Sequence, residues 1–167
     1  MHINLSFVQI VKSNIIKDVL ENIERYSAAN NHYVFEITET IEMDQIPAVQ
    51  NVFKEFAKNE FRFAIDDFGT GYSNYGYMRD RTFDIVKVDR SFVTDIDKLK
   101  DNYLMVSFII KMAHEMGLHV CIEGVETKEE LSCVKRLGAD YIQGYYYGKP
   151  VCLQDFEEQH LKRFVLG

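Results

Sequence analysis

The chain has 167 residues, 47% of them hydrophobic, which is enough for one domain with its own core. Its 19 basic and 26 acidic residues give a net charge of −7, which argues against binding of DNA or RNA polymers through a basic face. No run approaches the roughly 20 apolar residues that a membrane-spanning helix needs, and the first residues lack a signal-peptide pattern. The three cysteines form no CxxC pair, so we expect a reduced, cytoplasmic setting.

Strand and helix signals alternate along the first half of the chain. A short strand at residues 3–5 precedes residues 7–26, where apolar side chains recur three and four positions apart, as in an amphipathic helix. A strand at residues 33–37 and a helix at residues 48–57 are expected next. The apolar run at residues 61–65 then predicts a buried strand.

The second half continues this alternation. We expect a loop and short helix around residues 75–78, a strand at residues 85–88, and the clearest helix at residues 101–116, which Gly117 would end. The remaining expected elements are a strand at 118–122, a helix at about 128–137 followed by Gly138, a strand at 141–142 and a helical tail at 153–165.

These signals describe an α/β protein with about six β/α units in series, hence a parallel sheet with helical crossovers. Polar residues stand at nearly every strand end, which favours a barrel with a ring of functional residues over an open sheet with one crevice. A closed eight-unit barrel needs about 250 residues. We therefore predict a TIM-like barrel of the (β/α)8 type that is incomplete in this chain.

The most informative stretch is residues 66–71, Asp-Asp-Phe-Gly-Thr-Gly, which follows the predicted strand at 61–65. The neighbouring carboxylates of Asp66 and Asp67 repel each other and are costly to desolvate unless a cation compensates them. A divalent metal with oxygen ligands would do so. Asp and Gly are also common turn residues, so this stretch alone leaves a metal site and a solvated turn equally open.

Polar side chains at the other strand ends favour the metal site. Residues at the carboxyl ends of successive parallel strands converge on one region of a barrel. The residues concerned are Glu36 and Glu39, Lys87 and Asp89, Glu123 and Glu126, and Gln143.

Two glutamate pairs have the same informative spacing. Glu36 and Glu39 are three positions apart, so both cannot lie on one face of a regular strand. We expect Glu36 to lie in the site and Glu39 on a loop. Glu123 and Glu126 share this spacing and lead to the same expectation. Cys121, within an apolar strand, is expected to be a core residue and not a nucleophile.

At these residues the sequence strongly resembles the EAL-domain family of bacterial cyclic di-GMP phosphodiesterases. The matching motifs keep the family's order over nearly the whole chain, which is far more specific than any one of them. They are residues 4–6 (NLS), 35–39 (FEITE), 66–73 (DDFGTGYS), 86–92 (VKVDRSF), 123–127 (EGVET), 143–146 (QGYY) and a final Lys149-Pro150.

The resemblance implies a (β/α)8-type barrel that hydrolyses cyclic di-GMP to linear pGpG with Mg2+ or Mn2+. Such ligand sets of Asn, Asp and Glu suit Mg2+ or Mn2+ and disfavour Zn2+. The residues that resemble the family's metal ligands are Asn4, Glu36, Asp66 and Glu123, with Asp67 on the second metal.

Lys87 resembles the family's lysine that orients the attacking water, so Lys87 and Glu123 are the expected catalytic residues. From the residues alone, a lysine whose ammonium reaches from a strand end to solvent would be the simpler interpretation. Asp89 lies two positions beyond Lys87, on the same face of a regular strand. It could contact substrate or pair with Lys87, and the sequence leaves both open.

The resemblance also implies supporting roles. Glu126 and Gln143 resemble contacts to metal-bound water and to the site. Glu39 resembles the glutamate that anchors the loop at residues 67–71, which in this family can take part in dimerisation. Unpaired edges of an incomplete barrel recruit other strands, so a homodimer or other oligomer is expected.

The chain departs from the family in one respect. It contains no Glu-Ala-Leu tripeptide, whose Glu is a metal ligand in the family. We therefore interpret residues 1–167 as the C-terminal part of an EAL domain that lacks the first two β/α units and a substrate-contacting arginine. Impaired hydrolysis is expected. The alternative is a non-catalytic module that binds cyclic di-GMP or regulates a partner.

Overall fold

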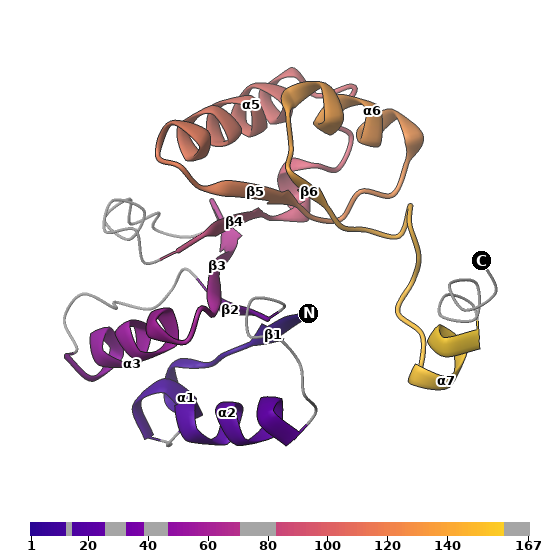
Figure 1. Cartoon of the computed structure of the whole chain (residues 1–167). Helices are drawn as coiled ribbons and strands as arrows, with labels where there is room; N and C mark the ends of the chain where they lie inside the picture. The colour runs from indigo at the N-terminus through magenta and orange to yellow at the C-terminus, as the bar shows by residue number, and fades with distance from the viewer. Residues whose placement is uncertain (13–14, 26–32, 39–46, 71–82, 159–167) are drawn as a thin grey trace.

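The computed structural model describes residues 1–12, 15–25, 33–38, 47–70 and 83–158. Six parallel strands form one sheet in which each strand pairs with its neighbour in chain order (Figure 1). The strands are β1 (His2–Asn4), β2 (Val34–Thr38), β3 (Arg62–Phe68), β4 (Ile85–Val88), β5 (His119–Ile122) and β6 (Tyr141–Ile142). The helices are α1 (Phe7–Lys12), α2 (Ile15–Arg25), α3 (Pro47–Lys58), the 3₁₀ helix η3 (Arg90–Phe92), α5 (Lys100–Glu115), α6 (Lys128–Leu137) and α7 (Leu153–Phe156).

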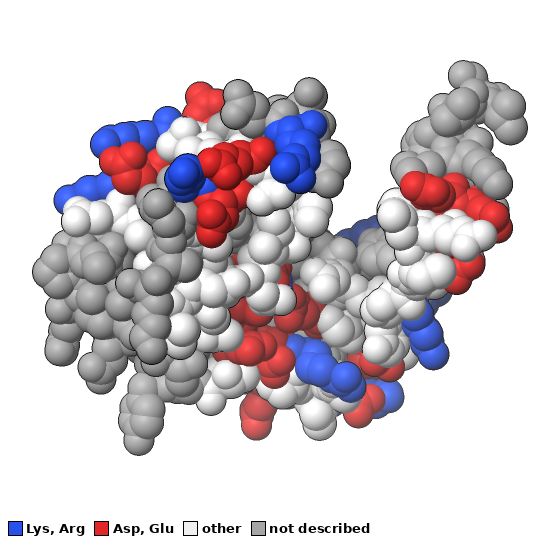
Figure 2. Space-filling model, turned by 90° about the horizontal axis from the view of Figure 1, so that it is seen from below, with Lys and Arg blue, Asp and Glu red and all other residues white. Residues whose placement is uncertain are grey.

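The sheet and its helices form a curled half-barrel, which confirms the predicted incomplete barrel of about six units. Strands β1 and β6 are its edges among the described residues. The segment that carries α7 extends away from the rest of the molecule (Figure 1). Figure 2 shows acidic side chains near the middle of one face, where the surface is hollowed between the main body and this segment.

Two expectations need correction. The single helix expected at residues 7–26 is described as two helices, α1 and α2. Strand β3 also continues through Asp66 and Asp67 to Phe68, so the two carboxylates lie within the strand and not after it. The reason is an irregularity in the pairing of β3 with β4, which lets the strand continue beyond the apolar run. The short helix expected around residues 75–78 lies outside the described residues, as does the tail beyond residue 158.

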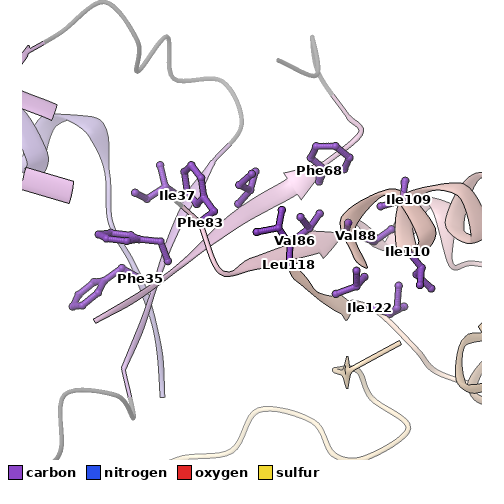
Figure 3. Packing of buried hydrophobic residues seen from close by; sticks show 14 of the residues in the cluster. Phe35, Ile37, Phe68, Phe83, Val86, Val88, Ile109, Ile110, Leu118 and Ile122 are labelled. Atoms are coloured by element: carbon purple, nitrogen blue, oxygen red, sulfur yellow. The ribbon is translucent and has the colours of Figure 1, made fainter. Parts of the chain in front are cut away.

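The main core lies between the sheet and the helices (Figure 3). Phe35 of β2 meets Phe56 of α3 edge-on, with ring centroids 4.8 Å apart, and Phe53 meets Phe63 of β3 at 4.6 Å. Burying such large side chains contributes most of the stability of a domain of this size. Farther along the sheet, α5 buries the side chains of Val106, Ile109, Ile110 and Ala113.

On the other, concave face of the sheet, the side chains change from apolar to charged along the strands. Its first layer is a small apolar cluster of Val34, Ala64, Ile85 and Cys121, one residue from each of β2 to β5. Side chains two positions further along a strand return to the same face. On each of these strands, that next position is charged. The residues that follow the four apolar positions are Glu36, Asp66, Lys87 and Glu123.

The predicted helix ends are also present. Gly117 follows α5 with φ of +78°, and Gly138 caps α6 with φ of +89°, in the left-handed region that suits glycine. Within the described residues, no helix has the length and apolarity needed to cross a membrane.

Candidate active site at the carboxyl ends of the strands

A buried lysine, Lys87, lies at the centre of the charged layer. Its side chain comes from β4, and it is 3% exposed. Its Nζ lies 2.7 Å from Glu36 Oε1 of β2, 2.7 Å from Asp66 Oδ1 of β3 and 2.6 Å from Glu123 Oε1 after β5. Three neighbouring strands thus direct carboxylates at one ammonium group. The alternative interpretation, in which the ammonium group reaches solvent, therefore does not hold for Lys87.

The charges in this layer do not balance, because three carboxylates surround one ammonium. Burial alone would lower the pKa of Lys87, but the hydrogen bonds that Lys87 donates to Asp66, Glu123 and Glu36 outweigh burial and raise that pKa. Burial raises the pKa of Glu123, and the nearby charges of Asp66 and Glu36 add to this against the opposing effect of Lys87. The negative charge of the layer contributes to both shifts, although burial is the largest cause that raises the pKa of Glu123.

Asp67 joins the cluster because β3 is irregular. The register between β3 and β4 shifts between Ile65 and Phe68, and Asp67 has φ of +55°, uncommon for a residue with a side chain. Consecutive residues of a regular strand point to opposite faces. Here, carboxylate oxygens of Asp66, Asp67 and Glu123 all lie within 4.8 Å of one another. No other such group of His, Cys, Asp or Glu ligands occurs among the residues that the structure describes.

The Asp67 carboxyl also experiences the surplus charge. Burial is the largest cause that raises its pKa, followed by the charges of Asp66 and Asp89, while Lys87 acts in the opposite direction. The backbone oxygen of Asp67 accepts hydrogen bonds from the backbone N–H and the hydroxyl of Thr70, at 3.2 and 2.9 Å. These bonds fix the turn that follows the irregular position.

The donor set fits a divalent cation. Its ligands are carboxylate oxygens, which suit hard cations such as Mg2+, Mn2+ or Ca2+. Binding of a cation would be favourable here, because the cation would relieve the repulsion between carboxylates that Lys87 leaves uncompensated. Cys121 does not take part as a soft ligand: burial raises the pKa of its thiol to about 12, and it belongs to the apolar layer below. This confirms its expected core position.

The first strand brings two further residues to Glu36. Asn4 pairs with Glu36 in the register of β1 and β2, and its side chain is exposed at the sheet edge. The imidazole Nδ1 of His2 contacts Glu36 Oε1. His2 was not singled out from the sequence. Its position two residues before Asn4, on the same face of β1, is the signal that would have indicated it.

A glycine after the acidic pair allows a close packing contact. Gly69 has φ of +96°, and a Cβ atom there would lie 2.9 Å from Cε2 of Phe92 in η3. The Phe92 ring therefore packs directly against the backbone that follows Asp66 and Asp67. A larger residue at position 69 would push against this ring and strain the backbone.

Asp89 has a local structural contact. Its carboxylate accepts a hydrogen bond from the Ser91 N–H at 3.0 Å and caps η3, in place of the pairing with Lys87 that the sequence left open. Burial opposes ionisation of Asp89, but hydrogen bonds from Ser91 and Arg90 outweigh it and lower its pKa. The charge of Asp89 still affects the site, because this charge raises the pKa of Asp67.

The remaining expected residues are more peripheral. Glu126 is exposed, and its Oε1 lies 3.8 Å from Nη2 of Arg90. Gln143 is exposed, and its backbone joins β6 to Ile122 and Val125. Glu39 lies outside the described residues.

The fold and the site together define a class: an incomplete TIM-like barrel with an acidic cluster that fits a divalent cation at the carboxyl ends of its strands. The family model of the EAL domain matches residues 1–150, and the chain belongs to this family. One relative is the probable cyclic di-GMP phosphodiesterase PdeA of Escherichia coli, 33% identical over 153 residues, which cover 92% of this chain and 21% of PdeA. The chain spans between 18% and 24% of the length of the first curated relatives that it matches.

Solved structures agree with this assignment. The EAL enzyme Bd1971, in its cAMP- and cyclic-di-GMP-bound form, matches with a TM-score of 0.88 and 34% identity, over 95% of this chain and 42% of that chain. The manganese and cyclic-di-GMP complex of BlrP1 from Klebsiella pneumoniae matches with a TM-score of 0.81 and 26% identity, over 89% of this chain and 38% of that one. The half-barrel therefore corresponds to part of the barrel of EAL enzymes.

Proposed function

We propose that this chain is part of a cyclic di-GMP phosphodiesterase that hydrolyses cyclic di-GMP to pGpG with Mg2+ or Mn2+. The observation that carries the proposal is the surplus of carboxylates around buried Lys87, at the strand ends of an EAL fold. Relatives named as cyclic di-GMP phosphodiesterases, and a related structure that contains manganese and cyclic di-GMP, support it.

The metal-holding residues in this proposal come from four strands. Two divalent cations about 3.5–4 Å apart would neutralise the phosphate, activate the attacking water and stabilise the leaving oxygen. The oxygen ligands would restrict the site to hard cations. The proposed ligands are Asn4, Glu36, Asp66, Asp67 and Glu123.

Lys87 and Glu123 are the proposed catalytic residues. The raised pKa of Lys87 keeps its ammonium charged at neutral pH, so it can donate hydrogen bonds to the attacking water or a phosphate oxygen but cannot act as a base. Its contact with Glu123 at 2.6 Å holds both groups at the same point. Asp89, directly after β4, is proposed to contact substrate, and Glu126, Gln143 and Glu39 to support the site.

The wider setting is also a proposal. We infer that residues 1–167 form the C-terminal part of one EAL domain and associate as a homodimer or other oligomer. Strands β1 and β6 are the edges of the sheet among the described residues, which supports this because exposed strand edges recruit other strands. A cytoplasmic location is supported by three free cysteines, Cys121, Cys133 and Cys152.

The test measures conversion of cyclic di-GMP to pGpG by chromatography, with Mg2+ or Mn2+ present. We expect slow conversion by the chain, and a further loss of about a hundredfold in Asp66→Asn, since a metal ligand supplies several kcal/mol of transition-state stabilisation. The matched control, Asp97→Asn, changes an exposed loop aspartate in the same way and should leave the rate unchanged. Binding of cyclic di-GMP without any conversion would instead support the non-catalytic module.

A further inference from the structure

Glu130 is a buried charged residue outside the active site. Three charged side chains are buried among the described residues, and the other two, Glu36 and Lys87, pair with each other. Glu130 is 6% exposed, and it forms no ion pair with the residues that the structure describes. A buried carboxylate without a cation requires several hydrogen bonds to offset its desolvation.

Three backbone N–H groups donate to the Glu130 carboxylate. Two come from Thr127 at 3.0 Å and Glu126 at 2.9 Å, both to Oε2, and the third comes from Asp95 at 3.1 Å, to Oε1. The bond from Thr127 completes a capping box, since the Thr127 hydroxyl accepts from the Glu130 N–H at 3.1 Å. The bonds from Glu126 and Asp95 are not part of that motif. Helix capping therefore explains only part of the environment of Glu130.

The two segments that Glu130 joins leave the sheet at the active site. Glu126 and Thr127 follow β5 and Glu123, whereas Asp95 belongs to the segment that follows β4 and Lys87. Asp95 has φ of +55°, a conformation that is disfavoured for a residue with a side chain. The bond to Glu130 helps to hold it there.

The segments that follow β4 and β5 are also in direct contact. Gly124 has φ of +71°, and a Cβ atom at this position would lie 2.3 Å from Cβ of Arg90. Arg90 Nη2 also lies 3.8 Å from Glu126 Oε1. A small shift of either segment would therefore be transmitted to the other, and to the contact between Lys87 and Glu123 at 2.6 Å.

We propose that Glu130 is a positioning residue, which fixes Glu123 relative to Lys87 by holding the segments after β4 and β5 together. This inference rests on the proposed function of Lys87 and Glu123. Residues behind the ligands of a metal site commonly change metal affinity or activity by 10- to 100-fold when they are substituted. Glu130 acts through backbone groups and not on substrate.

The ionised form of Glu130 is needed for this role. Burial opposes ionisation, but hydrogen bonds from Glu126, Thr127 and Asp95 outweigh it and lower the pKa of Glu130. A carboxylate accepts hydrogen bonds on both oxygens. In Glu130→Gln, one oxygen becomes an NH2 group, which would face at least one of the three N–H donors and could not accept from it.

The experiment compares Glu130→Gln with Glu129→Gln in the full chain. Glu129 is the exposed neighbour in the same helix turn, so the control makes the same chemical change. The first measurement is the 15N resonance of the Lys87 ammonium group in the metal-free protein, which reports its contact with Glu123. The second is the dissociation constant for Mn2+, followed by electron paramagnetic resonance.

We expect Glu130→Gln to shift the Lys87 resonance and to raise the Mn2+ dissociation constant about tenfold, while Glu129→Gln changes neither. A folded Glu130→Gln protein whose Lys87 resonance is unchanged would overturn the inference. If Glu130→Gln does not fold, Glu130→Asp, which keeps the charge but shortens the side chain, is measured in the same way and interpreted by the same resonance. The resonance requires no turnover, so a chain that fails to hydrolyse cyclic di-GMP overturns the proposed function and leaves this result readable.

Discussion

The two ends of the sheet use carboxylates in opposite ways. At the amino end, each aspartate has its own partner: Asp84 accepts from the Phe63 N–H at 2.8 Å, and Asp140 accepts from the Val120 N–H at 2.7 Å. Each of these bonds joins a residue that precedes one strand to the neighbouring strand. At the carboxyl end, Glu36, Asp66 and Glu123 share Lys87.

This difference separates stability from function. Carboxylates that accept backbone N–H bonds are favoured in the charged form and stabilise the fold. Carboxylates crowded around one cation repel each other, and the fold tolerates this repulsion at a site where a ligand can relieve it. The amino end is thus arranged for stability, and the carboxyl end for binding, as is general in parallel barrels.

The largest effect on this comparison is expected from Lys87→Met. Removing the one ammonium leaves three buried or half-buried carboxylates without their shared lysine, which should cost about 3–5 kcal/mol of the free energy of unfolding. Urea unfolding in the presence of a chelator measures the loss. Mn2+ should restore more stability to this variant than to the unsubstituted protein, since it would then replace the compensating charge of the missing ammonium.

The control for this variant is Lys100→Met, which removes an exposed lysine at the start of α5 and should change the free energy of unfolding by less than about 0.5 kcal/mol. Equal stability of Lys87→Met and the unsubstituted protein without metal would contradict the view that Lys87 compensates the carboxylates.

An intermediate effect is expected from Asp84→Ala at the amino end. The substitution leaves the Phe63 N–H without its acceptor, which should cost about 1–3 kcal/mol of the free energy of unfolding. The dissociation constant for Mn2+ should stay unchanged, because position 84 lies at the opposite end of β4 from the acidic cluster. A variant that loses metal affinity along with stability would show that the two ends are not independent.

Much of this arrangement can be predicted from the sequence, and there are physical reasons why the remaining features cannot. Runs of apolar residues predicted the strands, and the charged residues near their ends indicated Glu36, Asp66 and Lys87. The irregularity of β3 brings the Asp67 carboxylate close to that of Asp66. It depends on the pairing of β3 with β4, which no local sequence pattern contains. The bond between Glu130 and Asp95 joins residues 35 positions apart, so only the fold shows it.

The smallest expected effect is a difference in the pH dependence of stability without metal. Asp140 has a lowered pKa: burial opposes ionisation, but hydrogen bonds from His114 and Val120 outweigh it. Its contribution is therefore present above the usual pKa of 3.8 and is lost as the pH falls through its lower folded pKa. Glu123 has the opposite sign. Its pKa is raised, chiefly by burial, so the folded state binds its proton more tightly and stability rises as the pH falls through the range above the usual value of 4.5.

Thermal unfolding of two variants between about pH 2 and 7 separates these contributions. Glu123→Gln should remove the gain in stability on acidification, and Asp140→Asn should remove part of the loss at the acidic end of the range. Mn2+ should reverse the sign at the carboxyl end, because protons then compete with a bound cation for the same oxygens. If Glu123→Gln leaves the pH dependence without metal unchanged, the pKa of Glu123 is not raised in the folded protein, and the contrast between the two ends fails.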